Sequence, residues 1–291
     1  MADAQDQEVE LGRGWTITLA IFIGGVAYSL LYRFLLVIMY YGFNCEALGE
    51  LDMVFTHESA DNCHIMVGAL FLEKFDYFTM REHILRKSEK FDKFQSRLVK
   101  KFGLYFFQKM SQEEWAIKQK DVVIHNTEVQ SEKELNDLMC REMQNNNFGD
   151  HVQYRFILIP DYSQNESVFI MKCQHCMADG LALSSVLLGI SDEYDAKALP
   201  SLKPLGCFKH AIILLLSPFF VLHTLISVQC KKIDRNSITN DHPRTGIKRG
   251  GFTRDLSLKQ IKEFCKKKGC TINDYIAAMT CVTLHDYMSN N

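Results

Sequence analysis

The sequence predicts an α/β domain that carries two apolar segments. Three observations support this class. Strand-like and helix-like stretches alternate between residues 44 and 205, an apolar run precedes them, and a second apolar block follows them. The 291 residues suffice for one large domain or two small ones. A hydrophobic fraction of 47% and a charged fraction of 23% exclude an intrinsically disordered chain.

Charge and cysteine content narrow the functional classes. The 33 Lys and Arg against 35 Asp and Glu leave a net charge of −2, which argues against a nucleic-acid-binding protein because phosphate contacts need clustered positive charge. The 10 cysteines are too sparse for a disulfide scaffold, and their spacing suggests no pairing. We therefore expect reduced thiols and a domain that faces the cytosol.

An acidic tail, residues 1–14, precedes a predicted transmembrane anchor, residues 15–43. The apolar run Trp15–Tyr32 approaches the ~20 residues that a helix needs to cross a bilayer, and Arg33 after it can reach the interface. A signal peptide would need a basic start and a small-residue cleavage site, and neither is present. The alternative is a buried core helix with one arginine. The few flanking basic residues leave the orientation open.

The predicted α/β domain spans residues 44–205. Turn-forming residues from Pro160 to Asn165 separate two strand-like segments, which predicts a β-hairpin. Helical spacing of apolar residues indicates the helices. The predicted elements are the buried strand Cys63–Leu72, the helices Phe78–Lys90 and 132–143, the strands Val152–Ile159 and Val168–Gln174, and the core helix Leu181–Ile190.

A hydrophobic hairpin or membrane-interfacial segment is predicted at residues 206–232. Its apolar part, Ala211–Val228, is long enough to span a membrane, but Ser217-Pro218 lies at its middle and proline breaks a helix. Two arms of about eight to ten residues are each too short to cross. Basic residues at both ends favour one membrane face for both ends. The alternative is a helical hairpin buried in the core.

A basic loop, residues 233–255, and two helices, residues 256–291, complete the chain. The positive charge of the loop fits contact with anionic lipid and a solvated loop equally well. Local signals delimit the helices: a capping pair, a glycine stop and a second capping pair, at Ser257 with Gln260, at Gly269, and at Thr271 with Asp274.

The segment Gln174–Gly180 (QHCMADG) is the one most suited to chemistry. It leaves a predicted strand and enters a predicted helix, so His175 would be rigid enough to act as a general base near neutral pH. We expect Asp179 to fix the loop through an ion pair with a distant basic residue. We expect Gly180 to permit a tight exit where a Cβ would clash. Alone, the short motif also fits a loop histidine beside a structural Asp-Gly turn.

Four stretches in order resemble the wax ester synthase/diacylglycerol O-acyltransferase family of the CoA-dependent acyltransferase superfamily. They are Leu51–Phe55, Cys63–Leu70, Val152–Gly180 and Gly269–Ile276. The resemblance covers residues 44–291 except the apolar block. It implies a chloramphenicol acetyltransferase-like half-domain, a mixed sheet with flanking helices, that corresponds to the N-terminal half of the family. Family members continue into a second half-domain, and their acyl tunnel lies between the halves.

The resemblance also assigns roles to residues. His175 matches the catalytic base, and Asp179 and Gly180 match the structural pair of the motif. The family usually has two adjacent histidines; the first is Gln174 here, and the base is the second. Gln174 can form hydrogen bonds but cannot titrate. The residues expected to shape the site are Gln174, Asn273 and Asp274.

The implied activity is that of a membrane-bound O-acyltransferase. It would transfer a fatty acyl group from acyl-CoA to a long-chain alcohol or diacylglycerol, giving wax ester or triacylglycerol. His175 would remove the hydroxyl proton, and the alkoxide would attack the thioester. We expect acyl-CoA as co-substrate, no metal and no bound cofactor. We also expect a location in the endoplasmic reticulum membrane, and an oligomer or partner chain that supplies a second half-domain.

Other interpretations remain open at this stage. A catalytically inactive, acyltransferase-like membrane adaptor would keep the half-fold without a complete tunnel, and a truncated form of a longer enzyme is a third reading. Cys173-x-x-Cys176 has the spacing of half a zinc or redox site but no matching second pair. Asn165-Glu166-Ser167 fits a glycosylation acceptor, a short pattern that also arises by chance.

Overall fold

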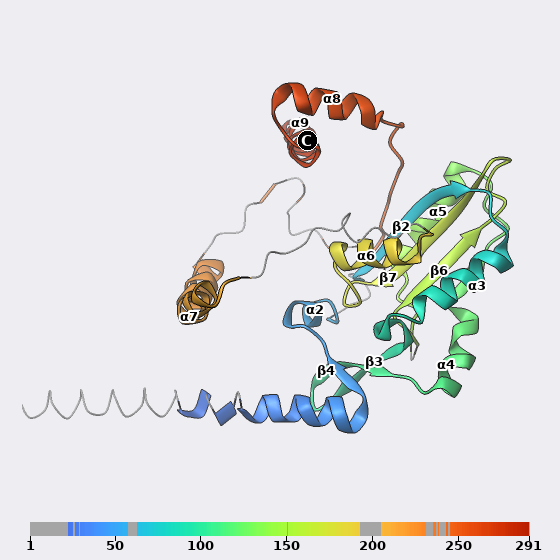
Figure 1. Ribbon diagram of the computed structural model, residues 1–291. Helices are drawn as coiled ribbons and strands as arrows, with labels where there is room; N and C mark the ends of the chain where they lie inside the picture. Colours follow the sequence, from blue (N-terminus) through green and yellow to red (C-terminus); the bar gives the residue numbers. More distant parts are fainter. Residues whose placement is uncertain are drawn as a thin grey trace, which may run out of the picture. The chain divides into compact units, whose positions relative to one another are not determined.

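The computed structural model divides the chain into two compact units, each described here by itself (Figure 1). Unit 1 is Met1–Leu199 with Gly246–Gly250, and unit 2 is Pro200–Thr245 with Gly251–Asn291. The predicted acidic tail, the start of the predicted anchor and parts of the basic loop lie outside the described residues. The described residues are 23–25, 27–28, 30–57, 63–149, 151–192, 205–230, 235–236, 238, 243 and 245–290.

A four-stranded mixed sheet forms the centre of unit 1. Its order is β2-β7-β6-β5, with antiparallel pairing except between β5 and β6. The predicted hairpin is confirmed as β6-β7, and the mixed sheet confirms the predicted α/β class. The strands are β2 (Ile65–Glu73), β7 (Glu166–Gln174), β6 (Tyr154–Ile159) and β5 (Val123–His125).

Helices cover both faces of this sheet (Figure 1). One face carries α3 (Tyr77–Ser88) and α6 (Gly180–Ile190) over a core rich in aromatic rings, and the other carries α5 (Glu132–Gln144) over aliphatic side chains. All three helices lie within a few residues of their predicted positions. Alternate residues of β6 and β7 face the two sides, so these central strands are buried on both faces.

The strand β2 is less buried than the sequence predicts. Ile65 is its one buried residue, and Leu70 and Phe71 are 42% and 45% exposed. The reason is its position: within the described residues β2 pairs with β7 alone, so it is an edge strand whose second side is open.

A second, three-stranded sheet was not predicted from the sequence. Its order is β1-β4-β3, and Phe102 and Gly103, both with positive φ, form the turn between β3 and β4. Two-residue hairpin turns of this kind usually have the sequence Asn-Gly. Because Phe102 occupies the first position, the sequence does not indicate the turn. The strands are β1 (Cys45–Ala47), β3 (Ser96–Lys101) and β4 (Leu104–Lys109); the remaining elements are α2 (Glu50–Val54), α4 (Gln112–Lys118) and the 3₁₀ turns Asp92–Gln95 and Gln119–Asp121.

An apolar helix, Ile23–Phe43, precedes this sheet. Its mean hydropathy of 1.6 and its length would allow it to cross a membrane, although core helices and signal sequences have the same properties. The helix continues past Arg33, whereas the sequence analysis places the end of the span near Tyr32. Its last turns pack against the small sheet, where Met39 is buried beside Cys45 and Phe106.

Three helices form the described part of unit 2. They are α7 (Cys207–Cys230), α8 (Leu258–Lys268) and α9 (Ile272–Asn290). The bend in α7, 46°, falls between Ser217 and Phe219 as predicted, but it is much smaller than the reversal that a hairpin needs. The membrane placement of the two arms stays a prediction. Ser257 caps α8 and Gly269 ends it with a φ of +67°, as predicted.

Candidate active site around His175

His175 follows the last residue of β7 and starts the turn that leads to α6. Its backbone N–H donates a hydrogen bond to the carbonyl of His64, 2.8 Å away, and the N–H of Met177 donates to the carbonyl of Gln174 over 3.0 Å. The backbone at His175 is thus tied to the residue that precedes β2. This is the strand–turn–helix setting that the sequence predicts for the motif.

The imidazole ring of His175 stacks on the ring of Phe55. The ring centroids are 3.8 Å apart and the planes differ by 21°, and the same Phe55 ring meets His64 edge-on at 5.6 Å. The Nδ1 atom of His175 is buried and has no hydrogen-bond partner among the described residues, while the residue as a whole is half-buried. Ring stacking and the backbone, instead of a carboxylate, therefore orient this imidazole, and part of it stays accessible.

Gln174 holds the stacking partner in place. Its side chain is almost fully buried, and its Nε2 donates a hydrogen bond to the carbonyl of Phe55 over 3.2 Å. Its Oε1 accepts a hydrogen bond from the thiol of Cys176. The Gln174 amide therefore connects Cys176, directly after His175, to the backbone of Phe55, whose ring stacks on His175.

Asp179 caps α6, which differs from the ion pair that the sequence analysis expects. Its Oδ1 accepts a hydrogen bond from the backbone N–H of Ala182 over 2.8 Å, the usual arrangement of an N-cap aspartate. In the described part of the chain Asp179 forms no ion pair. Because the cap fixes the first turn of α6, it also fixes where the loop after His175 ends.

The expected clash at Gly180 is wrong. A Cβ added to Gly180 would meet no described atom within 4 Å. Gly180 is the first residue of α6 and is exposed, so open space lies beside the N-terminal turn of this helix. The glycine therefore leaves room at the surface rather than relieving a crowded backbone.

The other two candidate residues, Asn273 and Asp274, belong to unit 2 and are described within that unit. Asp274 and Thr271 cap α9 reciprocally: the carboxylate accepts from the Thr271 N–H over 2.9 Å, and the Thr271 hydroxyl accepts from the Asp274 N–H over 3.1 Å. The hydrogen bonds from Thr271 lower the pKa of Asp274. Asn273 is exposed at the same turn.

The thiols beside His175 are poorly suited to metal binding or redox chemistry. Burial raises the pKa of Cys173 to about 12, which keeps it protonated at neutral pH, and Cys176 is also buried. All ten cysteines are free thiols. Among the residues that the structure describes, no group of three or more His, Cys, Asp or Glu is arranged to hold a metal.

Two contacts of Phe55, the hydrogen bond from Gln174 and the stack with His175, could not be predicted from the sequence. Phe55 and Gln174 lie 119 positions apart, and no local pattern connects them. The stretch Leu51–Phe55 resembles the opening segment of the acyltransferase family, which was the one available hint. The role of Phe55 as the ring beneath His175 depends on how α2 and β7 meet in three dimensions.

Comparison by sequence finds no matching protein-family model and no matching curated protein. Comparison of structures does find relatives in fold. The wax ester synthase/diacylglycerol acyltransferase of Marinobacter aquaeolei VT8 matches with a TM-score of 0.55 and 18% identity, over 84% of this chain and 61% of that one. The SgcC5 protein of Streptomyces globisporus matches with a TM-score of 0.46 and 15% identity, over 82% of this chain and 59% of that one.

The first of these likenesses establishes the fold. The chain has the mixed α/β fold of the wax ester synthase/diacylglycerol acyltransferase, as the sequence resemblance implies, and it spans about three fifths of the length of that enzyme. A weaker match is the starter condensation domain of rhizomide synthetase RzmA, whose structure was solved with C8-CoA; it has a TM-score of 0.39 and 11% identity, over 50% of this chain and 34% of that one.

Proposed function

We propose that this chain carries the histidine-bearing half of an acyl-CoA-dependent O-acyltransferase that makes neutral lipid esters. The observation that carries the proposal is the placement of His175: at the end of a central strand, in the fold of such an enzyme, with its ring held by Phe55 and partly accessible. The proposed acceptors are a long-chain alcohol or diacylglycerol. The proposed location is the endoplasmic reticulum membrane, with the domain in the cytosol.

The reaction needs one group that first accepts and then returns a proton. The imidazole of His175 takes the proton of the acceptor hydroxyl, and the oxygen attacks the thioester carbonyl of acyl-CoA. The tetrahedral intermediate collapses to the ester, the C–S bond breaks, and the CoA sulfur receives the proton from the imidazolium. A fixed ring lowers the entropy that must be lost to reach this geometry.

The remaining part of the proposed active site would come from a second half-domain. The chain spans 61% of the length of the wax ester synthase that it resembles in fold. We therefore propose that further sequence, a second copy or a partner chain completes the site and its acyl tunnel. The inactive membrane adaptor is the competing function, and activity measurements separate the two.

The test compares two histidines in similar ring stacks. We expect His175→Ala to lower ester synthesis from labelled palmitoyl-CoA and hexadecanol or dioleoylglycerol by about 10²–10⁴-fold, the usual contribution of a general base. His125 is the matched control because its ring stacks on Tyr77 at 4.1 Å and 11°, outside the site. His125→Ala should keep activity within about threefold, far below the contribution of a general base.

Two results would contradict this proposal. If His175→Ala retains activity, His175 is not the general base. Equal losses of activity in His175→Ala and His125→Ala would show a general effect of truncating a stacked ring. The unaltered chain should also be assayed in membranes of the cells that produce it, because any second half-domain is present there. If no ester is synthesised in those membranes, the inactive membrane adaptor is favoured.

A further inference from the structure

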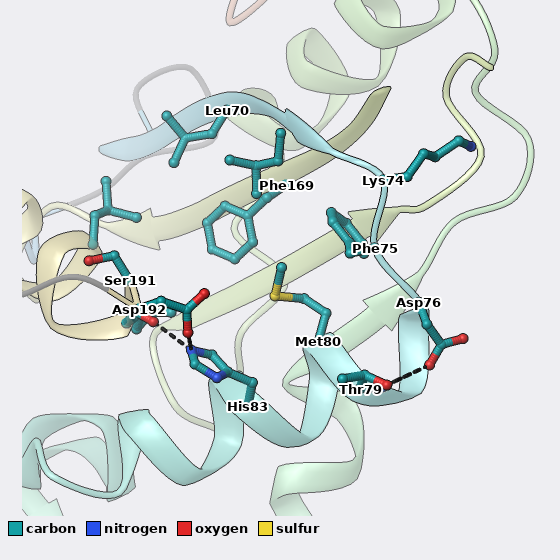
Figure 2. Close-up of a pocket in the computed structure, with 13 residues that line it drawn as sticks. Leu70, Lys74, Phe75, Asp76, Thr79, Met80, His83, Phe169, Ser191 and Asp192 are labelled. Carbon is teal, nitrogen blue, oxygen red and sulfur yellow. Dashed lines mark hydrogen bonds and ion pairs between the residues drawn. The ribbon is translucent and has the colours of Figure 1, made fainter. Parts of the chain in front are cut away.

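A cavity of about 600 Å³ lies in unit 1, and Figure 2 shows the residues that line it. His175 is not one of them. The cavity is on the face of the sheet that α3 and α6 cover, at the far ends of β2 and β7. Leu70 and Phe169, which are direct cross-strand partners, form its floor. The rest of its apolar lining comes from Leu72 on β2, Phe75 after β2, Met80 on α3, and Leu187 and Ile190 near the end of α6.

The polar side chains around the cavity are engaged with the protein itself. Lys74 donates to the carbonyl of Pro160 over 2.9 Å, and the ring of His83 is 2.6 Å from the carbonyl of Ile190. Asp76 caps α3 by accepting from the N–H of Thr79 over 2.9 Å. Figure 2 shows these groups at the margin, with Phe169, Met80 and Leu70 turned toward one another inside.

This lining selects a class of ligand. A nucleotide or sugar needs several polar groups that are free to turn toward it, whereas Lys74, Asp76 and His83 at this cavity already have partners. The remaining charged side chain, Asp192, is 93% exposed to solvent and lies 3.9 Å from His83. An unbranched apolar chain needs only volume and apolar walls, and about 600 Å³ falls within the ~300–1,000 Å³ of ordinary ligand pockets. Leu70, which lines the cavity from the edge strand β2, is 42% exposed, so a polar head beside it could remain in water.

We propose that this cavity binds the hydrocarbon chain of a single fatty acid, at a site separate from that of acyl transfer. The register of the sheet places Gln174 opposite Ile65 and Phe169 opposite Leu70. Five residues of strand separate the two positions, which corresponds to about 17 Å. Buried residues of the core, Met171 and Cys173, occupy the strand between them. The site does not depend on a catalytic role for His175.

Neighbouring residues of β2 provide a matched pair of variants. Leu70 points into the cavity, whereas Phe71 points to the opposite face, where its ring meets Tyr162 at 5.6 Å. The two are similarly exposed, at 42% and 45%. Leu70→Trp should fill the cavity, and Phe71→Trp should add similar bulk elsewhere. Leu187→Phe fills the same space from α6 and serves if Leu70→Trp proves unstable.

The probe is palmitate that carries a photoreactive diazirine near its methyl end, added to the full chain in phosphatidylcholine nanodiscs. We expect adducts, mapped by peptide mass spectrometry, in the segments Leu70–Phe75, Thr79–His83 and Leu187–Ser191, and competition by unlabelled palmitate. Leu70→Trp should weaken labelling about tenfold, equivalent to ~1.4 kcal/mol or roughly two buried methylene groups. Phe71→Trp and His175→Ala should label as the unaltered chain does.

Three outcomes would overturn the proposal. Adducts confined to other segments, such as Ile23–Phe43, would show that the probe reports lipid contact. Equal effects of Leu70→Trp and Phe71→Trp would show that the cavity is not the binding site. Loss of labelling in His175→Ala would place the chain at the site of transfer. Because ester synthesis is not measured, failure here leaves the proposed function to its own test.

Discussion

At the residue scale, the position of one imidazole depends on contacts that converge from two parts of the chain. The backbone of His175 bonds to His64, its ring lies on Phe55, and Gln174 bonds to the carbonyl of Phe55. Gln174 stands where the acyltransferase family usually has a first histidine. The structure shows what this amide does instead: it donates to one backbone group and accepts from one thiol, so it is satisfied in a buried position.

This arrangement predicts the effect of removing the amide. Gln174→Leu should destabilise the protein by about 1–3 kcal/mol, because the carbonyl of Phe55 loses a buried partner. Ester synthesis should fall further than this destabilisation explains, because the ring under His175 loses its anchor. Urea denaturation and initial rates at a temperature where both proteins are folded measure the two effects.

Gln153 is the matched control for this prediction. It is also a buried glutamine, and its Nε2 donates to the carbonyl of His151 over 2.9 Å, so Gln153→Leu removes a comparable hydrogen bond away from Phe55. We expect a similar loss of stability with little change in ester synthesis. Parallel loss of activity in both variants would count against a positioning role for Gln174.

At the element scale, capping residues define where the helices α6 and α9 begin. Asp179 caps α6, and Thr271 with Asp274 caps α9. The spacing of Thr271 and Asp274 is enough to predict the second cap. The predicted ion pair of Asp179 was wrong, because an aspartate directly before an apolar helix is itself an N-cap signal. Local hydrogen bonding thus explains both aspartates of the predicted motifs.

The cap of α9 predicts a dependence on pH. Hydrogen bonds from Thr271 hold the pKa of Asp274 below the ordinary aspartate value of 3.8 in the folded chain, so the carboxylate stabilises the helix start above about pH 4. This contribution is lost as the pH falls through the lowered pKa. We expect Asp274→Ala to reduce hydrogen-exchange protection in the first turn of α9 near pH 6, and the difference from the unaltered chain to shrink near pH 2.

Asn273 supplies the control for that experiment. It occupies the same turn and is exposed, so Asn273→Ala should leave the protection of α9 nearly unchanged at both pH values. A difference between Asp274→Ala and the unaltered chain that persists undiminished at low pH would mean that the carboxylate charge is not what stabilises the helix start.

At the scale of the whole molecule, the path of the chain constrains α7. The chain leaves unit 1 after α6 and returns to it at Gly246–Gly250. There the amine of Lys248 donates to the carbonyl of Cys63, the side chain of Gln144 donates to the carbonyl of Lys248 over 3.2 Å, and the N–H of Gly250 donates to the thiol of Cys140 over 3.1 Å. One folded unit therefore contains both flanks of the segment that carries α7.

This connectivity predicts the topology of α7 if it enters a membrane. One complete crossing would place its two flanks on opposite sides, and they could not join the same unit. The exposed cysteines at its ends, Cys207 and Cys230, are natural reporters. In sealed microsomes an impermeant maleimide should label both or neither, and permeabilised microsomes should label both. Labelling of one end from each side would contradict a re-entrant or interfacial α7.

Elements whose signals lie among neighbouring residues could be predicted from the amino-acid sequence. Two strand-like segments joined by a turn predicted β6 and β7, and apolar spacing predicted α3, α5 and α6. Capping signals predicted α8 and α9, and Ser217-Pro218 predicted the bend in α7. His175 at a strand end followed from the same local reasoning. Each of these patterns spans only a few residues, so the elements could be predicted without knowledge of any tertiary contact.

Which of these elements contact one another could not be predicted from local patterns. The stack of Phe55 on His175, the edge position of β2, the return of Lys248 to unit 1 and the cavity between Leu70 and Leu187 all join residues far apart in sequence. Such contacts follow from strand order and register, which depend on the packing of the whole core and leave no local pattern in the chain.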